Sequence, residues 1–218
     1  MTSTPPSSPS STFEQTVALL NEGNHEQAYA TISQNGGFSQ NPDDQHVAGI
    51  CLYEQASAEI TERHLQNAHK KLLKACEHFQ AAVDLIDARN QKPPGPNPIY
   101  IRDLGICKFA IVEMEFDLSE RTAEDTKQRV TACREIKDTL FRRVTKLRGH
   151  NAPLTRAFFA AVQFIAGQKN KAIMAFPDIF AQAVRAQKDN PSSENGKILA
   201  LITQIGQRYD LPTTRSLR

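Results

Sequence analysis

The sequence predicts an all-α protein of about eight or nine helices, arranged as stacked antiparallel helical hairpins. Apolar residues recur at helical spacing along most of the chain, and alternating β-branched runs are few. The interruptions in this pattern, 91–98, 149–153 and 189–191, contain proline or glycine, which end helices. A block of sequence also occurs twice, as expected for a chain built from repeated hairpins.

Asparagine followed by proline marks three predicted helix starts, at Asn41, Asn97 and Asn190. Asparagine is a good N-cap, and proline suits the first helical position. Thr122 with Asp125 three residues later predicts a capping box. The expected helices are 13–22, 25–35, 42–61, 64–89, 98–118, 122–148, 153–167, 169–187 and 192–208. The break at 61–64 has the weakest signal, because it contains neither glycine nor proline.

The repeated block is recognised by ordered matches. Asn41-Pro42, Gly49-Ile50-Cys51, Ala75-Cys76 and Phe79 correspond to Asn97-Pro98, Gly105-Ile106-Cys107, Ala132-Cys133 and Ile136. The first two matches are offset by 56 residues and the later ones by 57. This order predicts two equivalent helix pairs, with all four cysteines in equivalent places.

These features resemble the tetratricopeptide-repeat superfamily, whose repeats pair two helices with small residues at their crossing. The similar residues are Leu104-Gly105 on a first helix, Ala75, Phe79 and Ala82 on a second helix, and Gly23 and Gly167 at turns. The resemblance implies a stack of hairpins that binds proteins or peptides without catalysis. The repeat of 56 residues departs from the family's roughly 34, so the family's peptide-clamp residues are not implied.

The predicted organisation is one helical-repeat domain over 13–210, between a Ser/Pro-rich tail and a short C-terminus. Residues 1–12 have little apolar surface to bury and are expected to be disordered. Residues 211–218 are expected to be flexible. Within the domain the predicted units are about 13–40, 41–96, 97–150 and 151–190, followed by a capping helix at 192–208.

Residues that bind metals or perform catalysis have no recognisable arrangement in the sequence. Cys51, Cys76, Cys107 and Cys133 lack the close pairs typical of zinc sites and are expected to pack as small apolar side chains. His64 and His69 are five residues apart and fall on different faces of a helix. No nucleotide-binding or hydrolase motif occurs. We therefore expect no cofactor and no enzymatic activity; a catalytic site assembled from scattered residues is the alternative.

The cellular location is inferred from the absence of membrane signals. The longest apolar run has six residues, against roughly 20 needed to cross a bilayer, and the N-terminus lacks a signal-peptide pattern. The sequence thus predicts a cytoplasmic protein with reduced cysteines and no membrane contact.

Charge is distributed unevenly and gives the main functional hypothesis. Residues 13–126 contain 9 Lys and Arg against 18 Asp and Glu, whereas 127–171 contain 11 against 2. We predict a basic partner-binding face formed by Arg134, Arg142, Arg143, Lys146 and Arg156. It would suit a protein or peptide partner, such as an acidic one, in an adaptor or scaffold. Nucleic-acid binding and self-association are alternatives, and a merely solvated helix face would show the same pattern.

A phenylalanine-rich segment follows the basic stretch. Phe158 and Phe159 are adjacent, so both are buried only if their helix packs on two sides. The segment is expected to fill the core, or else to line a groove for a partner helix. Pro177 is expected to kink or interrupt its helix.

Overall fold

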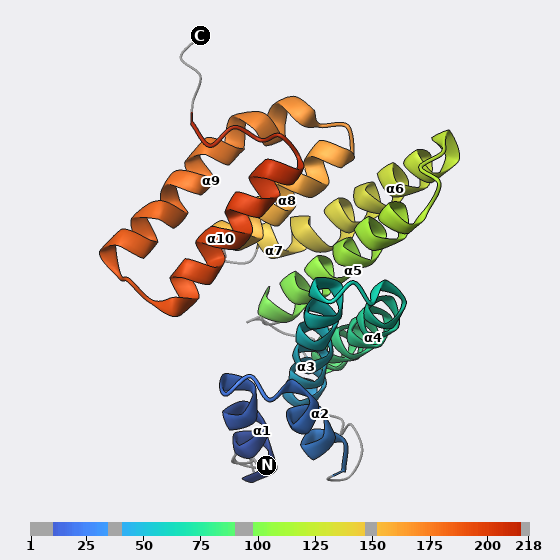
Figure 1. Cartoon of the computed structure of the whole chain (residues 1–218), viewed down its shortest axis with the longest axis vertical. Coiled ribbons are helices and arrows are strands. Elements are labelled where there is room, and N and C mark those ends of the chain that lie inside the picture. Colours follow the sequence, from blue (N-terminus) through green and yellow to red (C-terminus); the bar gives the residue numbers. More distant parts are fainter. Residues whose placement is uncertain (1–10, 35–40, 90–97, 147–151, 215–218) are drawn as a thin grey trace. The chain divides into compact units, whose positions relative to one another are not determined.

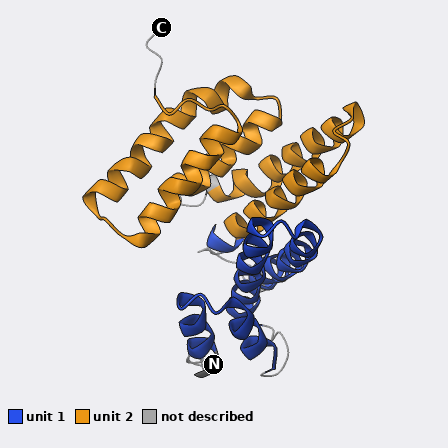
Figure 2. Ribbon diagram, viewed as in Figure 1, with its two compact units in different colours: residues 1–100 blue, residues 101–218 orange. Residues whose placement is uncertain are grey.

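A computed structural model of the chain describes residues 11–34, 41–89, 98–146 and 152–214, to which every structural statement below refers. Every regular element in them is a helix, which confirms the predicted all-α class (Figure 1). The helices fall into two compact units, residues 1–100 and 101–218, described separately below (Figure 2). The predicted disordered tail lies outside the described residues except for Ser11 and Thr12, which begin the first helix.

Unit 1 contains two helical hairpins. The first is α1 (Ser11–Asn21) with α2 (His25–Gln34), and the second is α3 (Pro42–Thr61) with α4 (Leu65–Arg89). The predicted N-cap Asn41 accepts a hydrogen bond from the backbone N–H of Asp43 at 3.2 Å. Apolar side chains of α2 and α3, including Ile32, Val47 and Cys51, form a buried cluster between the two hairpins.

The turns inside these hairpins have the same geometry. Gly23 and Arg63 each take a left-handed conformation (φ +81° and +65°), and each helix end is closed by two backbone hydrogen bonds. This is the Schellman arrangement, which satisfies the free carbonyls at the end of a helix. The weakly marked break at 61–64 is therefore real, and an arginine takes the conformation that usually requires glycine. Gly167 closes the same kind of turn in unit 2 (φ +88°).

A close helix crossing explains the glycine of the first repeat. A Cβ atom built on Gly49 of α3 would lie 2.6 Å from the ring of Phe79 on α4, closer than side chains approach one another. Both residues are buried, and so is Cys51 beside them. Glycine at this position lets the two helices pack with the phenylalanine ring between them.

Polar contacts connect the helices of unit 1. His78 on α4 lies between Tyr29 of α2 (hydroxyl to Nε2, 3.3 Å) and Gln45 of α3 (Nδ1 to Oε1, 2.8 Å). Tyr100 donates a hydrogen bond to Asp43 and packs edge-on against His46, with ring centroids 4.4 Å apart. Tyr100 belongs to α5 (Pro98–Leu118), the helix within which the boundary between the units falls.

Unit 2 continues α5 from Ile101 and adds a long interrupted helix and three further helices. The long helix consists of α6 (Ala123–Ile136), a π-helical turn η1 (Lys137–Phe141) and α7 (Arg142–Lys146). It is followed by α8 (Pro153–Ile165), α9 (Lys169–Asp189) and α10 (Ser193–Arg208). The predicted capping box of Thr122 and Asp125 is present.

One prediction about proline in unit 2 is wrong, and the interruption expected at Pro177 does not occur. Asn190 does not start α10; it follows the last residue of α9, and the hydroxyl of Ser192 caps α10 instead by accepting from the N–H of Asn195. Helix α9 continues without interruption through the buried Pro177. Packing against neighbouring helices stabilises α9 despite the one backbone hydrogen bond that proline removes.

The two repeat blocks are equivalent only in part. Gly105 faces an aromatic ring as Gly49 does, and Cys107 is buried like Cys51. The ring, however, is that of Phe141 in η1, whereas the residue predicted to correspond to Phe79 is Ile136. Cys133 is buried whereas its predicted counterpart Cys76 is half-buried, so the predicted equivalence of all four cysteines is wrong.

The pattern of burial shows that the second helices of the two blocks correspond with a different offset from the predicted one. Along the second helix of each block, the buried positions pair Ala75 with Cys133 and Phe79 with Lys137, one residue beyond the predicted correspondence. A lysine thus stands where the first repeat has its ring, and Phe141, one turn later, supplies the contact with Gly105.

The phenylalanine-rich segment fills the core of unit 2 only in part: Phe176 is buried, whereas Phe158, Phe159, Phe164 and Phe180 are half-buried. Phe158 packs edge-on against Phe109 of α5, and Phe159 packs against Phe141 of η1, with ring centroids 6.2 and 5.8 Å apart. Helix α8 therefore packs on two sides, as the adjacent phenylalanines require. Leu211 is also buried, so the packed chain extends past residue 210. None of the helices in the described ranges is both long and apolar enough to cross a bilayer.

Candidate functional site

A buried carboxylate on α5 organises one region of unit 2. Glu113 is 7% exposed and lies between apolar neighbours on its helix. Arg129 of α6 binds it with two parallel hydrogen bonds, from Nε to Oε1 at 2.6 Å and from Nη2 to Oε2 at 2.7 Å. Bidentate arginine–carboxylate pairs are among the strongest and most directional ion pairs in proteins.

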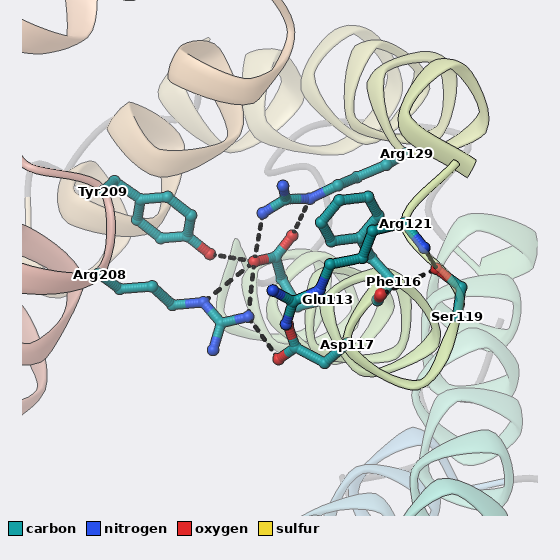
Figure 3. Close-up of polar contacts among 8 residues, drawn as sticks. All are labelled: Glu113, Phe116, Asp117, Ser119, Arg121, Arg129, Arg208 and Tyr209. Atoms are coloured by element: carbon teal, nitrogen blue, oxygen red, sulfur yellow. Dashed lines mark hydrogen bonds and ion pairs between the residues drawn. The ribbon is translucent and has the colours of Figure 1, made fainter. Parts of the chain in front are cut away.

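The end of α10 supplies two more donors to the same carboxylate. Arg208 Nε and the hydroxyl of Tyr209 lie 3.1 and 2.5 Å from Glu113 Oε2, and Arg208 Nη2 also binds Asp117 at 2.7 Å (Figure 3). Burial and then the charge of Glu113 raise the pKa of Tyr209, so this phenol keeps its proton. The network links α5, α6 and the end of α10 through one acidic group.

A groove of about 650 Å³ opens beside this network. Four cationic and three aromatic side chains line it: Arg121, Arg129, Lys169 and Arg208 with Phe116, Phe164 and Tyr209. We call it the Phe116 groove. Its walls come from the end of α5, the start of α6, the α8–α9 turn and the end of α10.

Each cation of the groove lies over one of its rings. The guanidinium of Arg129 is 4.2 Å from the centroid of Phe116, and that of Arg121 is 5.8 Å from the same ring. Lys169 lies 5.2 Å from the centroid of Phe164, and Arg208 lies 5.9 Å from that of Tyr209. No other cation–π pair occurs in the part of the chain that the structure describes.

The cations differ in how they are neutralised. Arg129 and Arg208 bind Glu113, whereas Arg121 has a 3.2 Å contact with Asp117 in which both side chains are well exposed. Exposed pairs of this kind contribute little stability. Lys169 makes no ion pair with any residue in the described ranges. Arg121 and Lys169 are therefore the cations most available to a ligand.

Two residues of the groove have unusual backbone conformations. Arg121 and Asp210 both line it, and both are non-glycine residues in the left-handed region (φ +57° and +51°). At Asp210 the conformation belongs to the Schellman end of α10, in which the N–H groups of Asp210 and Leu211 donate to the carbonyls of Gln207 and Gly206. The two conformations hold these residues at the ends of α5 and α10, where each helix stops.

The residues predicted for the basic face lie elsewhere in unit 2. Arg134 donates to the carbonyl oxygen of Ala166 at the end of α8 (3.4 Å), and Arg156 donates to Gln182 of α9 (2.7 Å). These two arginines thus connect helices. Arg142 forms an exposed pair with Asp138, at 3.0 Å, and Arg143 is half-buried on α7. The side chain of Lys146 lies outside the described residues, and the basic face stays a prediction.

Sequence reasoning missed the groove because its parts are distant in the chain. Glu113 is separated from Arg208 by 95 residues and from Tyr209 by 96. One signal was available: Glu113 interrupts an apolar stretch of α5, between Val112 and Met114, at a position that the helix buries. A charged side chain at such a position predicts an ion-paired partner from another helix.

The candidate metal ligands give a weaker site. Among the described residues, Glu59, Glu62 and His64 form the one group of three whose ligand atoms lie close together. Glu62 and His64 are exposed, and Glu59 already binds Lys71 at 2.8 Å. Burial raises the pKa of the Cys51 and Cys133 thiols to about 12, which keeps them protonated and favours the packing role expected for them.

No protein-family model, curated protein or solved structure matches this chain. The geometry of the Phe116 groove is therefore the basis on which a function can be proposed. Glu113 and Asp117 are bound by arginine donors and Tyr209 keeps its proton, whereas no described residue forms an ion pair with Asp210. The cations and rings of the groove suit the binding of an anionic or aromatic group.

Proposed function

We propose that this chain is a non-enzymatic adaptor that binds a short acidic segment of a partner protein in the Phe116 groove. The observation that carries the proposal is the groove itself, with Arg129 and Arg208 fixed by the buried Glu113. It takes the place of the basic face as the leading binding site, because Arg134 and Arg156 are engaged in bonds between helices.

Preorganisation is the physical reason for preferring the groove. A free arginine or lysine loses side-chain entropy when a ligand orders it, at a cost of about 0.5–1.5 kcal/mol for each such side chain. The ion pairs to Glu113 and the ring contacts already restrict Arg129 and Arg208. A ligand that reaches them therefore retains more of its interaction energy as affinity.

The contacts of the acidic groups support binding without catalysis. Glu113 accepts four hydrogen bonds, and Asp117 is shared between Arg208 and Arg121. A carboxylate held in this way is a poor general base, since its lone pairs face fixed cations. The protonated Tyr209 is likewise bound to Glu113.

The repeated hairpin turn supports the wider proposal of a tetratricopeptide-like scaffold. Gly23, Arg63 and Gly167 close three hairpins with the same pair of backbone bonds. Four cysteines without a disulfide are compatible with a reducing, cytoplasmic location.

The proposal is tested by selecting ligands from a phage-displayed library of random peptides on the full-length protein. We expect enrichment of acidic sequences that bind the wild-type chain and lose at least tenfold in affinity against Lys169→Glu. Lys169 is exposed at the start of α9, so the reversal should not disturb folding. Circular dichroism would verify that the variant keeps its helical content.

A matched control separates the groove from the predicted basic face. Arg142→Glu with Arg143→Glu changes twice as much charge on α7, away from the residues lining the groove. Peptide binding should survive this change. If the double variant lost peptide binding while Lys169→Glu kept it, the binding site would be the basic face and the groove proposal would be wrong.

Single-stranded nucleic acid is a second candidate, favoured by the alternation of rings and cations in the groove. Base stacking on aromatic side chains among cations is the usual basis of binding that does not depend on sequence. Such binding would weaken steeply between about 50 and 200 mM salt. Fluorescence anisotropy with labelled oligo(dT) and oligo(U) decides: saturable binding that Lys169→Glu abolishes would favour this candidate over a peptide.

A further inference from the structure

We infer that the Phe116 groove selects a single carboxylate next to an apolar side chain, and that Asp210 excludes more highly charged anions such as phosphomonoesters. This inference rests on the proposed function and specifies its ligand. Three observations carry it: the charges lining the groove, its apolar wall, and the backbone that fixes Asp210.

The charges of the groove leave room for one negative charge. Arg129 and Arg208, two of its four cations, bind the buried Glu113 beside the groove, and Asp117 binds Arg208 and Arg121. Asp210 is the second carboxylate that lines the groove. Four positive and three negative charges leave a surplus of one. A carboxylate neutralises this surplus. A phosphomonoester, with about −1.5 to −2 at neutral pH, would keep part of its charge unpaired in the groove, and the desolvation of this unpaired charge opposes binding.

The wall around Lys169 is apolar. Val130, Phe164 and Ile165 line the groove beside it, and the Lys169 ammonium lies over the Phe164 ring. A ligand that placed only a charge here would leave this apolar surface exposed to water. A side chain such as leucine next to the carboxylate would cover it, at a gain of roughly 25 cal/mol per Å² buried.

The backbone holds Asp210 at the edge of the groove. The N–H of Leu211 donates to the Gly206 carbonyl at 2.8 Å, and the Leu211 side chain is buried. These contacts fix the backbone of Asp210 in its left-handed conformation, so its carboxylate stays within the short reach of an aspartate side chain at this edge of the groove. The negative charge of Asp210 repels a dianionic ligand more than a monoanionic one, because Coulomb energy scales with the product of the charges.

Asp210→Asn isolates this charge. Asparagine tolerates the left-handed region at least as well as aspartate and has nearly the same shape, so the variant should fold normally. It raises the surplus in the groove from one positive charge to two. No other property of the groove changes.

The test uses three pools of fluorescein-labelled heptapeptides, each with a central Leu-X-Leu and degenerate flanks, where X is glutamate, glutamine or phosphoserine. For the wild-type protein we expect the glutamate pool to bind at least fivefold more tightly than the glutamine pool and more tightly than the phosphoserine pool. Asp210→Asn should improve glutamate binding about threefold and phosphoserine binding about tenfold, since the repulsion removed is twice as large. Lys169→Glu should abolish binding of the two acidic pools.

The outcomes separate the inference from the proposal beneath it. If the wild-type protein prefers phosphoserine, or if Asp210→Asn leaves the ratio of phosphoserine to glutamate affinity unchanged, the inference is wrong while the peptide groove stands. If no pool binds, or if Lys169→Glu binds like the wild type, both fall. The expected increase of about threefold in the ratio of phosphoserine to glutamate affinity has no explanation in a general folding defect, which would weaken the binding of both pools alike.

Discussion

The substitution Gly49→Ala tests the helix crossing on which the first repeat depends. A Cβ at this position would lie 2.6, 2.7 and 3.0 Å from three atoms of the Phe79 ring. The ring is 2% exposed and also contacts His46, so it has little space into which to move. Overpacking of this kind typically costs about 1–3 kcal/mol. Contacts of 2.6 and 2.7 Å with a confined ring place this case in the upper half of that range, at about 2–3 kcal/mol. Replacing a helical glycine by alanine returns about 1 kcal/mol, so we expect a net loss of about 1–2 kcal/mol.

The second repeat provides the matched control. The same substitution at Gly105 would place Cβ 3.3 Å from the nearest atom of Phe141, a tight contact that needs only a small shift. The helical gain and this strain should nearly cancel, giving a change close to zero. In the Gly49→Ala background, Phe79→Leu should cost less than it does alone, with a coupling energy of about 1 kcal/mol.

The assay exploits the distribution of tyrosines. The chain has no tryptophan, and Tyr29, Tyr53 and Tyr100 lie in unit 1 whereas Tyr209 lies in unit 2. Tyrosine fluorescence in a urea titration therefore reports mainly on unit 1, and circular dichroism at 222 nm reports on both units. If Gly49→Ala matched or exceeded the wild type in its unfolding free energy, the crossing would not be limited by the Phe79 ring.

Three further predictions follow from single residues. Arg63→Gly should raise the unfolding free energy by about 1 kcal/mol in a urea titration, because glycine adopts φ +65° without a steric penalty; an unchanged midpoint would contradict this. Burial lowers the pKa of His78 in the folded protein, so the imidazole binds a proton more readily in the unfolded chain. The unfolding free energy of unit 1 should therefore fall as the pH drops below about 6.5, the usual pKa of histidine. A urea titration at several pH values should show that His78→Gln removes this part of the pH dependence. Glu113→Gln should lower the unfolding free energy by about 2–4 kcal/mol, because Arg129 then keeps a buried charge without its partner. Thermal denaturation measures this loss, and a variant that melts at the wild-type temperature would refute the prediction.

Much of the fold follows from local signals in the sequence. Helices α3, α5 and α8 begin at the predicted prolines because proline fixes the first helical residue without losing a hydrogen bond. The Thr122 box is equally local. Where two local signals compete, the prediction fails: Ser192, two residues after Asn190, caps α10. The π-helical turn η1 has no comparable local signal, since it depends on how Phe141 packs against Gly105.

The candidate site could not be found in the same way. A groove depends on which helices meet, and the spacing of charges along the chain does not contain that information. The basic stretch 127–171 includes Arg129, but the residues next to it in the sequence do not distinguish it from Arg134. Their different roles arise from Glu113 on α5 and Ala166 at the end of α8.

Helix α5 constrains how the protein can be dissected into fragments. Its first turn carries Tyr100, which serves Asp43 and His46 of unit 1, while its later turns carry Gly105 and Glu113 of unit 2. A fragment that stops at Arg89 lacks the Tyr100 ring that packs in the first unit. A fragment that starts at Ile101 lacks the proline with which the helix begins. Each half, expressed alone, would therefore need its own copy of this entire 21-residue helix.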